Sequence, residues 1–137
     1  MRIHRASAND VGLFSSIAAD VFDAEITVAG ITAYLNAPGH LMVLAFDGDV
    51  IVGQCMGVRH FHPDKPSDLY IDEVGTATSH LRQGVARAML AEMFAWGREF
   101  GCSVVWLATE DDNAPAIGLY RGLDGQEDTV RYYEFTL

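Results

Sequence analysis

Residues 80–88 form the segment best suited to chemistry with phosphate. They follow an expected strand and open an expected helix, where unpaired backbone N–H groups and the positive end of the helix dipole favour an anion. Gly84 has no Cβ and Ala86 is small, so the backbone can approach phosphate oxygens closely. Arg82 and Arg87 add positive charge to a chain with few basic residues. The segment predicts a pyrophosphate site, although an ordinary helix start with a packing glycine has the same pattern.

A second candidate segment covers residues 113–123. Asn113 can cap a helix that Pro115 helps to start. Tyr120 falls seven residues after Asn113, about two turns along that helix. Taken alone, Tyr120 is typical of the edge of an amphipathic core. Both candidate segments follow an expected strand, however, and this combination is hard to obtain by chance.

Two groups of carboxylates could take part in acid–base chemistry or bind a cation. Asp72 and Glu73 lie on an expected strand, and because side chains alternate along a strand we expect them on opposite faces. Either could instead pair with an arginine. The acidic run Glu110, Asp111 and Asp112 comes just before the second candidate segment. It could bind a polycation, or it could be a solvated turn with helix-capping acids.

Histidines and cysteines provide little evidence of a metal site. His60 and His62 have alternate spacing, but no other Cys or His is nearby in the sequence, so we expect no metal and place both histidines in a loop on the substrate side. Cys55 and Cys102 lie in apolar runs and are expected to pack as free thiols. Two cysteines do not resemble a secreted disulfide framework.

The elements that position these residues follow from hydrophobic spacing. Apolar residues at steps of three and four predict helices, apolar runs predict strands, and Asp-Gly between two such runs predicts a hairpin. The expected strands cover residues 2–6, 41–46, 50–58, 69–76, 103–109 (buried) and 129–137. The expected helices cover residues 11–21, 27–35, 82–100 and 114–123. This order predicts one α/β domain over residues 1–137, with a mixed sheet and helices on both faces.

Composition limits the partners. Half of the 137 residues are hydrophobic, which is enough for one core without disulfide or metal. Lys and Arg total 9 against 19 Asp and Glu, for a net charge of −10. We therefore expect no nucleic acid and no membrane as a partner and favour a cationic substrate, unless the acidity serves only solubility. No signal peptide or membrane span is visible, so a cytoplasmic location is expected.

The two candidate segments resemble motifs of the GNAT acetyltransferases. Residues 82–86, Arg-Gln-Gly-Val-Ala, resemble their acetyl-CoA pyrophosphate loop, Gln/Arg-x-x-Gly-x-Gly/Ala, although Leu81 stands where Gln or Arg is usual. Residues 113–120 resemble their Asn-x-x-Ala-x-x-Leu-Tyr motif, although Leu-Asp-Gly follows in place of Leu-Gly-Phe. The element order matches as well, so the resemblance covers essentially the whole chain. Within the superfamily, residues 70–76 and 125–128 are similar to the type I aminoglycoside 3-N-acetyltransferases.

The resemblance implies a GNAT fold with a mixed, mostly antiparallel sheet, acetyl-CoA as co-substrate and acetyl transfer to an amine. Tyr120 matches the general acid toward the CoA thiolate, and a backbone N–H near Thr76 would polarise the thioester carbonyl. Glu73, directly or through water, is favoured as the base over Asp72. The residues that would hold acetyl-CoA are Val74, Thr76, Arg82, Gln83, Gly84, Val85, Ala86, Arg87 and Asn113.

Several acceptors fit this interpretation. The leading hypothesis is an aminoglycoside-like cationic amine, bound by the acidic run Glu110, Asp111 and Asp112. A peptide or protein amine is the second hypothesis. A non-catalytic acyl-CoA-binding module is the third; Leu81 favours it, and Tyr120 argues against it. Because the superfamily often dimerises, the aromatic final strand could pair across a homodimer interface.

Overall fold

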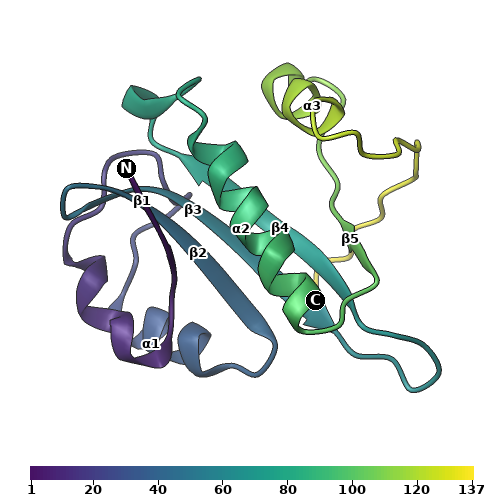
Figure 1. Ribbon diagram of the computed structural model, residues 1–137, viewed down its shortest axis with the longest axis horizontal. Coiled ribbons are helices and arrows are strands. Elements are labelled where there is room, and N and C mark those ends of the chain that lie inside the picture. Colours follow the sequence, from purple (N-terminus) through teal and green to yellow (C-terminus); the bar gives the residue numbers. More distant parts are fainter. The chain divides into compact units, whose positions relative to one another are not determined.

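The computed structural model describes residues 1–137, which form two compact units, Met1–Leu107 and Ala108–Leu137. A single domain over the whole chain stays a prediction. The first unit contains, in order, β1 (Arg2–Arg5), η1 (Ala8–Ser15), α1 (Val28–Asn36), β2 (His40–Asp47), β3 (Val50–His60), β4 (Asp68–Thr76), η2 (Thr78–His80), α2 (Val85–Glu99) and β5 (Val104–Trp106) (Figure 1). The second unit contains α3 (Ala114–Arg121). None of the helices combines the length and the apolar character that crossing a membrane requires.

The five strands form one sheet in the order β1-β2-β3-β4-β5. The first three pairs are antiparallel, and only β4 and β5 run parallel. The predicted hairpin is present, because β2 ends at Asp47, β3 begins at Val50, and Gly48 adopts a φ of 57° in the turn. The prediction of a mixed, mostly antiparallel sheet is confirmed.

Helix α2 lies across one face of this sheet (Figure 1). Its close approach depends on glycines in β3. A Cβ added to Gly53 would lie 2.9 Å from both Val85 Cγ1 and Met89 Cε, and a Cβ added to Gly57 would lie 3.2 Å from Met93 Sδ. These helix residues are buried, so the missing side chains on the strand let α2 pack its apolar stripe against the sheet.

Helix α1 covers the other face, so the prediction of helices on both faces is confirmed. Thr27 caps α1, because its Oγ1 accepts a hydrogen bond from the Gly30 N–H at 3.0 Å. The Tyr34 hydroxyl donates to the Leu41 carbonyl at 2.8 Å, which fixes the helix to β2. Ile31 is the buried residue of α1.

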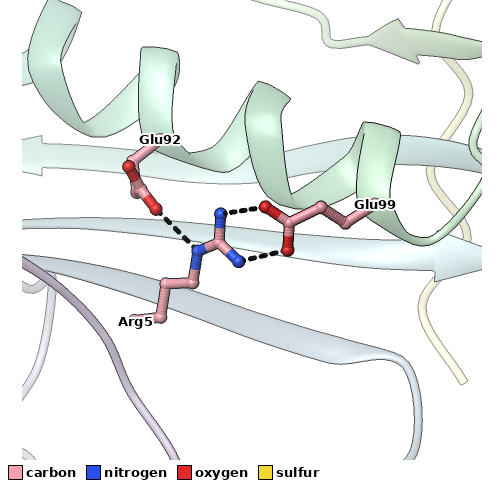
Figure 2. Close-up of polar contacts among 3 residues, drawn as sticks. All are labelled: Arg5, Glu92 and Glu99. Carbon is pink, nitrogen blue, oxygen red and sulfur yellow. Dashed lines mark hydrogen bonds and ion pairs between the residues drawn. The ribbon is translucent and has the colours of Figure 1, made fainter.

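Arg5 links the first strand to α2 (Figure 2). Its guanidinium donates two hydrogen bonds to Glu99, at 2.6 and 2.8 Å, and its Nε donates to Glu92 at 2.6 Å. This fork geometry is the arrangement in which an arginine–carboxylate pair is strongest. Arg5 thereby binds two residues of α2 that lie 87 and 94 positions after it in the sequence.

The predicted helix over residues 11–21 is wrong. The segment forms the 3-10 helix η1, which Ser7 starts and which ends at Ser15. The backbone then pairs with β3, because the Ile51 N–H donates to Ser16 and the Ala18 N–H donates to Ile51, each at 2.9 Å. Bonding to the sheet thus replaces the helical bonds that the apolar spacing favoured.

The last two predicted strands are also corrected. The strand over residues 103–109 is shortened to β5, and it is not buried, since Val104 is 56% and Trp106 is 45% exposed. The strand over residues 129–137 is absent, because none of the strand pairs of the sheet includes these residues. Their apolar side chains at Val130, Tyr132, Tyr133 and Phe135 are 69% to 81% exposed. A segment with a strand-like sequence forms a strand only where its backbone can hydrogen-bond to a neighbouring strand.

Candidate active site

A β-bulge in β4 changes the direction of the carboxylates predicted to do proton chemistry. Across the β3–β4 pair, Met56 lies opposite Glu73 but Gly57 lies opposite Ile71, so Asp72 is an extra residue. Ile71 therefore belongs to the α2 face with Gly57, while Glu73 lies on the α1 face. Simple alternation would place Ile71 and Glu73 on the same face, so it does not hold across the bulge, and the prediction that Asp72 and Glu73 point to opposite faces loses its basis there.

Glu73 is held in an environment that favours proton uptake. Its Oε1 accepts a hydrogen bond of 2.5 Å from Gln54 Nε2. Burial raises the pKa of Glu73 above its ordinary value, the charges of Asp23 and Asp72 raise it further, and only the Gln54 hydrogen bond lowers it. A carboxylate whose pKa is raised toward neutrality is a better general base than an ordinary surface carboxylate.

Beside Glu73, a cavity of about 300 Å³ opens between α1 and the sheet. Its walls are formed by Phe22, Asp23, Ala24, Glu25, Ile26, Gly30, Ile31, Tyr34, Met42, Met56 and Glu73. Three of these residues are acidic, so the cavity attracts cations. A neighbouring hollow of about 290 Å³ shares the 22–26 wall with it, apart from Asp23.

Sequence reasoning did not identify Asp23, Glu25, Tyr34 or Gln54. The only available signal was the acidic pair flanking Ala24 ahead of a helix cap. Tyr34 and Gln54 lie in segments whose spacing indicates a core helix and a core strand. Burial together with the charges of Asp72, Cys55 and Glu73 raises the pKa of Tyr34, so its hydroxyl stays protonated and can continue to donate to β2.

The far edge of β4 is open beyond its first three residues. Only Asp68–Tyr70 pairs with β5, while β4 continues to Thr76. On that side, residues 71–76 have no strand partner, so their backbone groups can pair with an extended ligand. Thr76 Oγ1 is buried and has no hydrogen-bond partner, which is unusual for a buried hydroxyl. Val74 and Thr76, both predicted to contact the cofactor, lie on this stretch.

The predicted phosphate loop lies next to the same end of β4. Val85 packs over Gly53, and Gly53 pairs with Thr76, so the start of α2 is at the C-terminal end of the strand. Gly84 caps α2 with a φ of 81°, and Arg82 has a φ of 59°. Left-handed residues at a helix start turn successive N–H groups toward one point, which is a geometry that binds anions.

The other predicted residues of the loop and of the first turn of α2 are exposed or partly buried. Gln83 Nε2 donates to the Ser79 carbonyl at 3.1 Å, so its side chain stabilises the loop. Arg82 and Arg87 are exposed, and Ala86 is partly buried on the first turn of α2. The structure thus places Thr76 and residues 82–87 together, while their contacts with a cofactor stay a prediction.

The remaining predicted residues belong to the second unit. Asn113 caps α3 as predicted, with its Oδ1 accepting from the Ala116 N–H at 3.3 Å. Glu110, Asp111 and Asp112 are exposed just ahead of that cap. Tyr120 lies in the last turn of α3. The roles predicted for these five residues stay predictions.

His60 and His62 pair with an aspartate. The His62 imidazole bonds to Asp68, and His60 Nδ1 lies 3.4 Å from the same carboxylate. Trp106 Nε1 also donates to Asp68 at 2.5 Å. The His62 hydrogen bond, followed by that of Trp106, lowers the pKa of Asp68. These contacts join the 61–67 loop to the start of β4. His62 lies in that loop as predicted, whereas His60 is the last residue of β3, so the loop placement predicted for His60 is wrong. No group of three or more His, Cys, Asp and Glu side chains is arranged to hold a metal ion.

Comparison with known proteins identifies the family of the chain. The family model described as the acetyltransferase (GNAT) family matches residues 13–124. A mouse protein described as probable N-acetyltransferase family 8 member 5 is 31% identical over 106 residues, which are 77% of this chain and 46% of the mouse protein. The chain therefore spans about half the length of this curated relative.

Two solved structures share the fold at lower sequence identity. An aminoglycoside acetyltransferase from an uncultured soil metagenomic sample superposes with a TM-score of 0.85 and 21% identity, covering 99% of this chain and 97% of that one. AAC(6')-Iy, in complex with the bisubstrate analogue CoA-S-monomethyl-acetylneamine, has a TM-score of 0.80 and 16% identity, covering 99% and 98%. The narrower resemblance to 3-N-acetyltransferases stays a prediction. The family match extends over most of the chain, and the chain belongs to the GNAT acetyltransferase family.

Proposed function

We propose that this protein is an N-acetyltransferase that moves an acetyl group directly from acetyl-CoA to a primary amine of a small cationic acceptor. The observation that supports this most is the acidic cavity beside Glu73 at the bulge of β4. An ammonium group must be attracted to the site and must then lose a proton before it can attack. Negative charge in the cavity serves the first need, and a carboxylate with a raised pKa serves the second.

Acetyl-CoA supplies the activated acetyl group, and the residues present fit it. The open edge of β4 can pair with an extended chain that carries amides, and the orphaned Thr76 Oγ1 offers one more polar contact there. The start of α2, where Gly84 has a left-handed backbone conformation, suits a pyrophosphate. We assign cofactor binding to Val74, Thr76, Arg82, Gln83, Gly84, Val85, Ala86, Arg87 and Asn113.

Two proton transfers are assigned to side chains. Glu73 accepts the proton of the acceptor amine, directly or through water, and Asp72 is the alternative base. Tyr120 donates a proton to the departing thiolate. A backbone N–H near Thr76 stabilises the oxyanion that develops on the thioester carbonyl. Glu73 is favoured over Asp72 because Glu73 is partly buried and lines the cavity, whereas Asp72 is exposed.

The acceptor class proposed first is an aminoglycoside-like polyamine. The cavity walls contribute Asp23 and Glu25, and the acidic run at residues 110–112 remains a proposed second anchor. A related fold binds a bisubstrate analogue that combines CoA with acetylneamine. A homodimer and a cytoplasmic location, both expected from the sequence, remain proposals without a structural observation of their own.

The test is thiol release from acetyl-CoA by the purified protein against aminoglycosides, polyamines and short basic peptides. Release with aminoglycosides supports the proposal, and release with peptides alone would replace the acceptor class. Acetyl-CoA binding without release for any amine would favour a binding-only module and refute catalysis. Tyr120→Phe is expected to lower turnover strongly with near-normal acetyl-CoA binding, and Glu73→Gln to lower it by roughly 10²- to 10⁴-fold. Asp72→Asn is the matched control for Glu73.

A further inference from the structure

Gln54 is a buried polar residue to which the mechanism above gives no role. It lies in the middle of β3, is fully buried, and is the single polar residue among the buried side chains of the chain. Burying an amide in an apolar core is unfavourable unless its hydrogen bonds are made. The contacts of Gln54 should therefore show what offsets its burial.

Those contacts orient the amide in one direction. Its Nε2 lies 2.5 Å from Glu73 Oε1 and 3.4 Å from the Val21 carbonyl oxygen, and both of these groups are acceptors. Its Oε1 has no partner. Turning the amide over would place an oxygen against two other oxygens, so the side chain must present its donor to Glu73 even though its own carbonyl is left without a bond.

Gln54 also joins two parts of the cavity. Val21 leads into the segment that carries Asp23 and Glu25, and Glu73 lines the same cavity from β4. The backbone of Val21 can approach β4 only because residue 75 is a glycine: a Cβ there would lie 2.1 Å from the Val21 oxygen and 3.0 Å from Gln54 Nε2. The amide therefore bridges the strand with the proposed base and the acidic wall of the acceptor cavity.

The other groups around Glu73 cannot replace this donor. Asp72 on the same strand and Asp23 on the 22–26 wall are negative, and Glu25 lines the same cavity. Tyr34 on α1 donates its hydroxyl proton to the Leu41 carbonyl instead. Without Gln54, the described surroundings of the Glu73 carboxylate would all favour its protonated form.

We propose that Gln54 is a positioning residue for acetyl transfer: its amide holds the Glu73 carboxylate ionised at the wall of the acceptor cavity and ties the 21–25 segment to it. The inference rests on the proposed function, in which Glu73 is the base. It predicts that Gln54 affects catalysis through the protonation and placement of Glu73, without touching either substrate.

Gln54→Met tests this, because methionine keeps the side-chain length and removes the donor. The assay is thiol release from acetyl-CoA with neamine as acceptor, measured as kcat/KM across pH. The acid limb of the profile should move to higher pH, and kcat/KM on that limb should fall about tenfold, with a smaller loss at alkaline pH where Glu73 is ionised in both proteins. Leu44→Val is the matched control, since Leu44 pairs with Gln54 across β2 and β3 and is equally buried.

A second measurement separates this inference from the proposed function. Carboxyl-carbon NMR titration of Glu73 follows its protonation directly, without turnover. A higher midpoint in Gln54→Met than in Leu44→Val supports the effect of Gln54 on Glu73. Unchanged turnover in Glu73→Gln would instead refute the proposed base and, with it, the catalytic role of Gln54. An unchanged midpoint overturns the inference, whatever the activity. If Gln54→Met does not fold, Gln54→Glu offers a second test, because glutamate has the shape of glutamine. The carboxyls at positions 54 and 73 should then share one proton, whose pKa lies well above the normal range of a carboxyl group. Two carboxyl groups that each titrate in the normal range would overturn the inference.

Discussion

Gly75→Ala should be the most damaging single-methyl change on the cavity side of the sheet. The added Cβ would lie 2.1 Å from the Val21 carbonyl oxygen, whereas ordinary contacts begin at 3.4 Å. The oxygen must therefore retreat by about 1.3 Å, the difference between these two distances. Because the obstructing atom belongs to the backbone, no rotamer change can relieve the clash, and the 21–25 segment itself must move.

Two magnitudes follow from that displacement. Overpacking a core costs about 1–3 kcal/mol, and a backbone clash places this change at about 3 kcal/mol, which lowers the Tm of a chain of this size by about 10 °C. A shift of about 1 Å in a group that positions the substrate can cost about 10²-fold in rate. We therefore expect a loss of about that size in kcat/KM for the amine acceptor.

Thermal unfolding and thiol release measure these two effects. Gly12→Ala is the matched control, since a Cβ at Gly12 has nothing within 4 Å, and it should change neither value appreciably. Gly57→Ala is a second comparison, because its Cβ meets movable side-chain atoms of Leu69 and Met93 at 3.2 Å. If Gly75→Ala melts and turns over like Gly12→Ala, the Val21 segment does not pack against β4 and the cavity described above is wrong.

Three other changes test separate parts of the molecule. Gly84→Ala should lower stability by about 1–2 kcal/mol through its left-handed φ of 81° alone, since space for the methyl is open, and should raise KM for acetyl-CoA; equal stability by denaturant unfolding would contradict the loop geometry. The double variant Asp23→Asn/Glu25→Gln should raise KM for a polycationic acceptor more than for a monoamine in the thiol-release assay. Equal effects on both acceptors would show that the charge of these two residues does not bind the polycation. Arg5→Gln should lower Tm at neutral pH. The Arg5 hydrogen bonds hold the pKa of Glu99 below its ordinary 4.5, so this contribution is present above that pH and is lost as pH falls through the lowered pKa. The Tm difference between the two proteins should therefore shrink in acid, and a difference independent of pH would contradict the pair.

Local signals explain which predictions succeeded. The Asp-Gly hairpin, the Thr27 start of α1, the apolar stripe of α2 and the Asn113 cap of α3 depend on residues within a few positions of one another, and all four are present. The predictions that failed depended on distant partners. Residues 16–18 pair with Ile51 instead of continuing a helix, and residues 129–137 have a strand pattern without a strand partner.

The candidate site divides in the same way. The motifs at residues 82–86 and 113–120 could be found in the sequence, because backbone geometry at a helix start needs particular residue types at a fixed spacing. The family match over residues 13–124 confirms the membership that they indicated. Glu73 could be proposed from its strand, but the reason to prefer it to Asp72 comes from the bulge, which depends on the register with β3.

By itself, therefore, the sequence determined the fold class and the family, and it predicted a phosphate-binding loop before α2, since each depends on local spacing that survives without neighbours. Only the tertiary structure decided that Gln54 donates to Glu73, that Gly75 admits the Val21 backbone, and that Asp23 and Glu25 line the cavity beside them. Hydrogen bonds and close approaches between residues 19 to 54 positions apart leave no periodic trace, because each partner alone is an ordinary residue of its own segment.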